Sequence, residues 1–182
     1  DPNAGEELAY AWDLDGDGTF ETTARTPTCD ASGLDVPDTR TVTVKVTDAA
    51  NQEAMASLSW TVNPALSITT ATIPETTLTR PLTAITLAAT GGTAPRTWSA
   101  TGLPSGLSLN SSGVLSGTPS AAASTPVEFK VSDANGATAT TTLSVTVNPA
   151  PSIVTASLPF AVSGSAYTQT LASSGGTGAR TW

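Results

Sequence analysis

The sequence predicts an all-β protein built from tandem β-sandwiches, and three observations support this prediction. Hydrophobic residues alternate with polar residues over several short stretches, clusters of glycine, proline, serine and threonine separate these stretches, and one segment recurs after 84 residues. Alternation with a period of two indicates strands with one buried face, and no stretch has the 3.6-residue period of an amphipathic helix. A repeat of this length indicates tandem domains rather than the short units of a solenoid.

The first element is an acidic loop between residues 12 and 21. Asp13, Asp15 and Asp17 occupy alternate positions, two glycines bend the backbone between and after them, and Glu21 closes the run. Several oxygen ligands at this spacing suit a hard cation, so we expect calcium bound by these four side chains and by the carbonyl of Thr19. The alternative is a simple turn, since Asp and Gly often form turns. We favour the metal because three carboxylates within five positions repel one another unless a cation lies between them.

Four half-buried antiparallel strands follow from the alternation of Val, Leu, Ala, Phe and Trp with polar residues. They lie at residues 42–46, 56–62, 127–131 and 143–147. Asp133 and Asn135, in the step between the last two strands, belong to a predicted hairpin turn that ends at Gly136. A second calcium site at Asp133 and Asn135 is the alternative, and we favour the turn because a lone Asp-x-Asn-Gly sequence is typical of one.

An internal repeat divides the chain. Residues 63–98 align with residues 148–182, and the Gly-Gly-Thr triplets that begin at Gly91 and Gly175 lie 84 positions apart. Each copy opens with Asn-Pro-Ala directly after a Val-rich strand, and proline ends a strand and stiffens the exit from it. We therefore predict three domains, residues 1–64, 65–149 and 150–182, connected by short, semi-rigid joints. Tryptophans stand at matching places in them, at positions 12, 98 and 182, and we expect them in sandwich cores rather than on sugar-binding surfaces.

The first domain resembles a known family. Residues 10–18 read Tyr-Ala-Trp-Asp-Leu-Asp-Gly-Asp-Gly and residues 40–48 read Arg-Thr-Val-Thr-Val-Lys-Val-Thr-Asp. Together they resemble the later part of a polycystic-kidney-disease (PKD) domain, an immunoglobulin-like sandwich. The resemblance implies an extracellular module and leaves the ligand open.

The second domain resembles another family of sandwiches. Residues 102–109 read Gly-Leu-Pro-Ser-Gly-Leu-Ser-Leu and residues 113–119 read Gly-Val-Leu-Ser-Gly-Thr-Pro, preceded by Gly-Gly-Thr at 91–93 and Thr-Trp-Ser-Ala at 97–100. These runs resemble the putative-immunoglobulin (He_PIG-like) repeats of bacterial surface proteins, and residues 150–182 resemble the first third of another copy. The resemblance implies spacer, adhesion or enzyme-appended modules.

Composition excludes several functions. The net charge is −8, and the acidity belongs to residues 1–64, which carry twelve acidic and three basic side chains, against three and four in residues 65–182. No basic patch exists for nucleic acid, and no apolar run approaches the ~18 residues of a membrane span. The single Cys29 cannot form an internal disulfide, and we expect it to be a small buried side chain. The chain begins without Met or a signal peptide, so we expect it to be a piece of a longer protein.

Catalysis has little support in the sequence, so we predict no enzyme. The chain has no His, and no Lys stands where it could activate a Ser. We expect a secreted or cell-surface structural or adhesive segment of a bacterial protein, stiffened by calcium, whose partners are neighbouring domains, copies of itself, surface glycans or other surface proteins. A polysaccharide-binding module of a secreted hydrolase and a filament subunit assembled by strand complementation are the alternatives. Asn110 begins a glycosylation sequon whose use the sequence leaves open.

Overall fold

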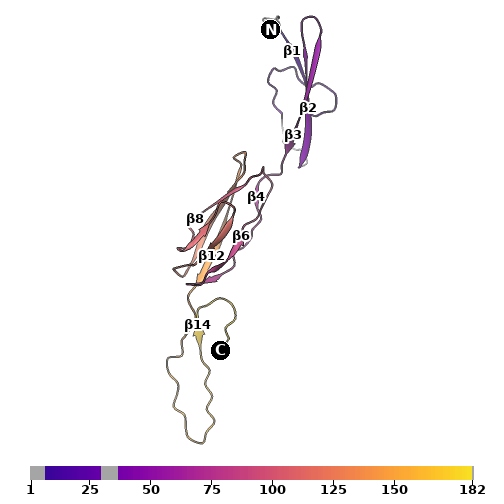
Figure 1. Cartoon of the computed structure of the whole chain (residues 1–182). Coiled ribbons are helices and arrows are strands. Elements are labelled where there is room, and N and C mark those ends of the chain that lie inside the picture. Colours follow the sequence, from indigo (N-terminus) through magenta and orange to yellow (C-terminus); the bar gives the residue numbers. More distant parts are fainter. Residues whose placement is uncertain (1–6, 30–36, 182) are drawn as a thin grey trace. The chain divides into compact units, whose positions relative to one another are not determined.

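The computed structural model describes residues 7–29 and 37–181, and all regular structure in these ranges is β (Figure 1). The chain forms two compact units, Asp1–Pro64 and Ala65–Trp182, each taken by itself below. Among the described residues, no helix is long and apolar enough to cross a membrane. The strands are β1 (Ala9–Asp13), β2 (Asp38–Thr47), β3 (Glu53–Val62), β4 (Ser67–Ile68), β5 (Thr76–Thr77), β6 (Leu82–Thr86), β7 (Ala89–Thr90), β8 (Thr97–Thr101), β9 (Leu107–Leu109), β10 (Val114–Gly117), β11 (Ala123–Ser132), β12 (Thr138–Asn148), β13 (Ser152–Ile153) and β14 (Ser173–Ser174).

The first unit is built on an antiparallel sheet in the order β1-β2-β3. One face of this sheet carries a row of hydroxyl pairs between β2 and β3, and such cross-strand pairs help to fix the register. The pairs are Thr39 with Thr61 at 3.3 Å, Thr41 with Ser59 at 3.2 Å and Thr43 with Ser57 at 2.9 Å. The predicted strands at 42–46 and 56–62 are therefore confirmed as β2 and β3.

The opposite face of this sheet is apolar. It forms an open hollow of about 310 Å³ lined by Trp12, Cys29, Val42, Val44, Ala56, Leu58 and Trp60. No second layer covers it among the described residues, so Leu58 is 77 % exposed and the expected burial of β3 is wrong. The expectation that Cys29 is buried is wrong for the same reason, since Cys29 lines this uncovered face and is exposed. The indole nitrogen of Trp60 is buried without a hydrogen-bond partner in the described part of the unit.

The second unit contains a closed sandwich between residues 65 and 148. One sheet has the order β5-β12-β11-β8 and the other β6-β10-β9, with the short ribbon β4-β7 beside them (Figure 1). Leu115 of β10 and Val127 and Phe129 of β11 are fully buried between the sheets, which stabilises the fold by about 1.5–3 kcal/mol for each large apolar side chain. The predicted strands at 127–131 and 143–147 are confirmed as parts of β11 and β12. Trp98 packs against this core, as expected, whereas Trp182 lies outside the described residues.

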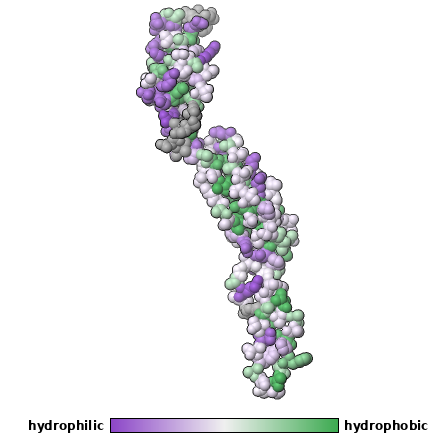
Figure 2. Space-filling view, turned by 180° about the vertical axis from the view of Figure 1, so that it is seen from behind, coloured by the Kyte–Doolittle hydropathy of each residue, from purple (hydrophilic) through white to green (hydrophobic). Residues whose placement is uncertain are grey.

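The rest of the second unit, residues 150–181, repeats the opening of the sandwich without a covering layer. β13 pairs with β14 as β4 pairs with β7. Large apolar side chains of this segment stay in contact with solvent, and Figure 2 shows hydrophobic residues on its surface at the lower end of the view. These exposed side chains are Ile153, Val154, Leu158, Phe160, Val162, Tyr167 and Leu171.

Candidate metal centre

The acidic loop is a tight excursion from the end of β1. The chain leaves β1 at Asp13 and returns eight residues later, where the Glu21 N–H donates to the Trp12 carbonyl and the Trp12 N–H donates to the Thr22 carbonyl, each at 2.8 Å. The Trp12 indole N–H also donates to the Ala24 carbonyl at 2.8 Å. These three bonds hold the two ends of the loop together, so the acidic side chains belong to a short, closed loop.

Asp13 organises the loop from the inside. It is only 5 % exposed, and its two oxygens accept the N–H groups of Gly16 at 2.6 Å and Gly18 at 3.0 Å. Both glycines have positive φ, +80° and +88°, which residues with a side chain rarely adopt. A Cβ on Gly16 would also come within 3.1 Å of the Thr41 carbonyl oxygen, so glycine is required there.

The other acidic side chains turn toward the same point. Glu21 accepts the Leu14 N–H at 2.7 Å, and Asp17 accepts the Thr19 N–H at 2.6 Å. One oxygen from each of Asp13, Asp15, Asp17 and Glu21 lies within 4.8 Å of all the others. The structure thus brings together the four carboxylates that the sequence singled out.

The spacing of these oxygens fits a calcium ion. Calcium binds oxygen at about 2.3–2.6 Å, so two ligands on opposite sides of one ion are about 5 Å apart at most. Because 4.8 Å is an upper limit on these separations, it is compatible with the calcium distances. The donor set, all carboxylate oxygen, also excludes the softer metals that favour sulfur or imidazole. Thr19 as a fifth ligand through its carbonyl stays a prediction.

The second acidic position of interest, Asp133, forms a turn. Its carboxylate accepts the N–H groups of Asn135 at 3.0 Å and Ala137 at 2.8 Å, and Gly136 has a φ of +83°. This geometry supports the hairpin interpretation over a second calcium site.

Asp133 also binds the loop before β8 at the same end of the sandwich, a contact that the sequence did not predict. Its other oxygen accepts the Thr93 N–H at 2.8 Å, forty residues earlier in the chain. The pKa of Asp133 is lowered below its ordinary value of 3.8, and the bond from Thr93 is the largest cause. The bonds within the turn lower the pKa further, whereas burial acts in the opposite direction. No local pattern joins two positions so far apart, so sequence reasoning had no signal for this contact.

The match to a known family concerns the sandwich of the second unit. Residues 64–148 match the family model named Putative Ig domain (He_PIG), which confirms the resemblance inferred for the second domain. The fold class is therefore all-β with an immunoglobulin-like domain. No curated protein sequence matches the chain. The PKD resemblance of residues 1–64 stays a prediction.

Solved structures of modest similarity accompany this match. A Bacteroides fragilis structure described as a putative alpha-galactosidase is 26 % identical, with a TM-score of 0.41, over 45 % of this chain and 17 % of that one. Sidekick-1 immunoglobulin domains 1–5 are 16 % identical, with a TM-score of 0.47, over 81 % of this chain and 34 % of that one. A fragment of intimin in complex with its translocated receptor is 17 % identical, with a TM-score of 0.46, over 83 % and 55 %. The chain thus spans about a sixth of the length of the galactosidase structure.

Proposed function

We propose that this chain is a non-catalytic structural or adhesive segment of an extracellular bacterial protein, and that calcium stiffens its first unit. The observation that carries the proposal is the cluster of four carboxylates at the end of β1. Like charges this close destabilise the loop unless a cation lies between them. The cluster is tied to the sheet through Asp13, so a cation bound there would make the loop and the sheet one rigid body.

The rest of the chain supports a structural role. The sandwich core consists of close-packed aliphatic and aromatic side chains, and residues 64–148 match an immunoglobulin-like family, whose fold is a scaffold on which functional sites are added separately. The absence of His from the sequence leaves acid–base or nucleophilic chemistry without its usual partner. Neighbouring domains, copies of the chain, surface glycans and surface proteins are the partners that such a segment would meet.

The polysaccharide-binding alternative has less support. A sugar-binding sheet face presents a row of exposed aromatic rings on adjacent strands. The exposed aromatic side chains among the described residues are Phe20, Phe160 and Tyr167, and all three lie in loops. Trp12 and Trp60 on the uncovered sheet face are half-buried and lie on β1 and β3, which β2 separates, so they form no row on adjacent strands. Phe20 is moreover covered on one side by the Lys45 ammonium, 5.2 Å from the ring centre.

A filament assembled by strand complementation is a second candidate, favoured by one specific observation. The described part of the first unit exposes an apolar sheet face, and residues 150–181 expose an apolar ribbon. Exposed apolar surface of this kind marks interaction sites. Sedimentation of the full chain tests the filament: concentration-dependent growth that Leu58→Asp abolishes supports it, and a monomer at all concentrations excludes it.

Thermal unfolding with and without calcium tests the calcium proposal. Extracellular calcium modules bind with dissociation constants of roughly 10⁻⁴ to 10⁻³ M, and a ligand at 100 times its dissociation constant stabilises the folded state by about 2.7 kcal/mol. We expect chelator to lower the melting temperature of the first unit, and Asp15→Ala to remove this sensitivity.

The matched control is Asp48→Asn, because Asp48 is an acidic residue of the same unit that accepts N–H groups in the separate β2–β3 turn. It should keep the calcium response. Identical melting of the wild type in chelator and in millimolar calcium would show that the acidic loop is only a turn.

A further inference from the structure

Backbone hydrogen bonds hold the last residues of β12 against β5. β12 runs parallel to β5 there, with Asn148 opposite Thr77, and the Asn148 carbonyl accepts the Leu78 N–H at 2.8 Å. The chain then leaves through two prolines, at positions 149 and 151. The side chain of Asn148 therefore projects from a rigid point, immediately before the next repeat begins.

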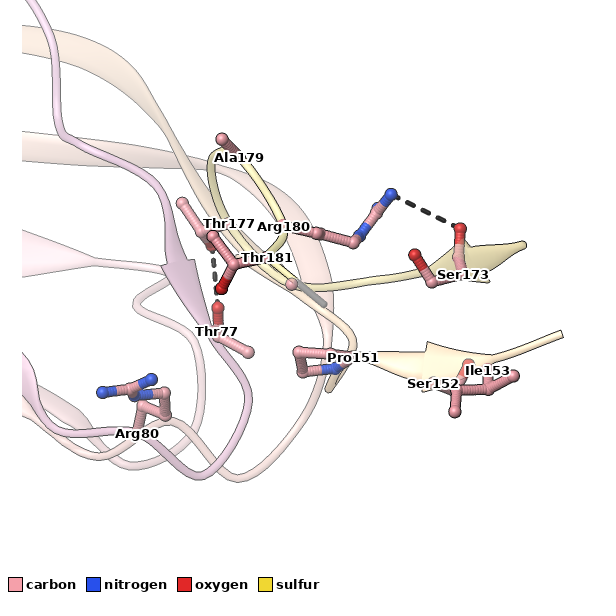
Figure 3. A pocket seen from close by; sticks show the side chains of 11 residues that line it. Thr77, Arg80, Pro151, Ser152, Ile153, Ser173, Thr177, Ala179, Arg180 and Thr181 are labelled. Carbon is pink, nitrogen blue, oxygen red and sulfur yellow. Dashed lines mark hydrogen bonds between the residues drawn. The ribbon is translucent and has the colours of Figure 1, made fainter. Parts of the chain in front are cut away.

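This side chain joins the sandwich to the residues that follow. Its amide nitrogen donates to Glu75 Oε2 at 2.8 Å and to Thr177 Oγ1 at 3.1 Å. Glu75 can only accept from this amide, so it orients the nitrogen toward Thr177. Thr177 Oγ1 in turn lies 2.8 Å from Thr77 Oγ1, a bond drawn in Figure 3.

Thr77 makes this contact selective. It is only 7 % exposed, so its hydroxyl would be costly to leave without a partner. The Thr177 hydroxyl supplies that partner, in a bond for which either oxygen can be the donor, and it also accepts from the Asn148 amide. A side chain without a hydroxyl at position 177 could do neither.

The backbone of the Gly175-Gly176-Thr177 turn fits against the same joint. Gly176 donates its N–H to the Pro149 carbonyl at 2.7 Å, and both glycines have positive φ, +71° and +75°. A Cβ on Gly175 would overlap the Ala150 carbonyl oxygen, and a Cβ on Gly176 would lie 3.0 Å from the Pro151 ring.

The open hollow beside this contact, about 480 Å³, is lined by residues from both sides of the joint, among them Thr77, Pro151 and Thr177 (Figure 3). The polar contacts described above therefore border open space.

We propose that the Asn148 end of the sandwich, defined as Glu75, Thr77 and Asn148, is a docking surface for the Gly-Gly-Thr turn of the next repeat. Its partner is thus a second domain of the same kind, recognised by the threonine hydroxyl of a turn whose two glycines let it close against the segment 149–151. The docked turn fixes the direction in which the next repeat leaves the sandwich, so successive repeats form a directed array rather than a flexible string.

Hydrogen exchange of the Gly176 amide in the full chain, followed by NMR, tests this docking. The Gly176 N–H donates to the Pro149 carbonyl, directly after Asn148, so we expect its exchange to accelerate when the turn leaves the joint. Thr177→Val removes the hydroxyl at nearly constant shape and should accelerate its exchange about tenfold, since two hydrogen bonds are lost. Thr177→Ser should keep protection within about twofold of the wild type, because the hydroxyl remains.

The matched control is Thr181→Val, which removes another hydroxyl from the lining of the same hollow and should leave the exchange of Gly176 unchanged. Amides of β11 and β12 report in every variant whether the sandwich is folded. Equal Gly176 exchange in the wild type and Thr177→Val, with the sandwich folded, would overturn the proposal.

Distances between spin labels give an independent test of direction. The labels are placed on Thr142→Cys and Ala172→Cys, both exposed, in a Cys29→Ser background. We expect one narrow distance distribution, broadened by Asn148→Ala and by Thr177→Val and kept narrow by Thr177→Ser. A broad distribution in the parent chain, or one that neither variant changes, would contradict a fixed direction.

Discussion

Two segments of the second unit, residues 65–98 and 150–181, share a short ribbon and a glycine turn but have very different surroundings. In the first, Thr70 Oγ1 accepts the Ala88 N–H at 2.8 Å, and in the second, Thr155 Oγ1 accepts the Ala172 N–H at 2.7 Å. Arg96 and Arg180 both donate Nε–H at 2.9 Å to the first carbonyl of the Gly-Gly-Thr turn. The backbone of the two copies is thus set by local bonds that the shared sequence provides.

Burial separates the two copies. Ile73 is 7 % exposed and Leu87 is 4 % exposed, whereas the equivalent Leu158 and Leu171 are 57 % and 42 % exposed. The difference lies in what covers them, since β10, β11 and β12 pack over the first copy and no described strand packs over the second. A ribbon can therefore acquire its shape from its own sequence, but its apolar side chains contribute stability only when another layer covers them.

The largest effect expected from this comparison is in a pair of matched truncations. Leu87→Ala removes a buried side chain and should lower the free energy of unfolding of the sandwich by about 2–5 kcal/mol. Leu171→Ala removes the equivalent exposed side chain and should change it by less than about 0.5 kcal/mol. Urea unfolding of both variants measures the difference, and equal losses would mean that the C-terminal copy is covered after all.

An acid-dependent effect should distinguish the two Gly-Gly-Thr turns. Thr93 donates its N–H to Asp133, whereas no carboxylate among the described residues accepts that of Thr177. The pKa of Asp133 is lowered in the folded state, so the ionised carboxylate stabilises the fold. This contribution to stability is complete above the ordinary pKa of 3.8 and is lost as the pH falls through the pKa of the folded state.

We therefore expect part of the stability lost by the sandwich between pH 7 and about pH 3 to depend on Asp133. Asp133→Asn, which cannot titrate, should lose less over the same interval. Urea unfolding at both pH values makes the comparison. The same loss in the wild type and the variant would show that this carboxylate does not contribute.

The smallest effect concerns the two arginines. Arg96→Lys replaces a half-buried guanidinium that binds two carbonyls and should destabilise the sandwich by about 1 kcal/mol, because Lys cannot reproduce the planar fork. Arg180→Lys makes the same change in the uncovered copy and should leave sandwich unfolding unchanged. Thermal unfolding of both variants measures the change in stability. A larger loss of sandwich stability in Arg180→Lys than in Arg96→Lys would contradict this prediction.

The sequence predicted well whatever depends on neighbours along the chain. Alternation placed β2, β3, β11 and β12, and the carboxylates at 13, 15, 17 and 21 converge because one short loop carries all four. Burial of Leu58 and Cys29 was predicted wrongly because it depends on a layer that no local pattern reveals. The bonds from Asp133 to Thr93 and from Asn148 to Thr177 were missed since they join residues forty and twenty-nine positions apart.

Stretching single molecules of the full chain, first in millimolar calcium and then in chelator, tests most directly the claim that this is a calcium-stiffened structural segment. We expect one cooperative unfolding event for residues 64–148, with a gain in length of up to about 300 Å and the same force in both solutions. We also expect a second event, from the first unit, whose force falls when calcium is removed. Gradual extension without discrete events, or two events indifferent to calcium, would contradict this claim.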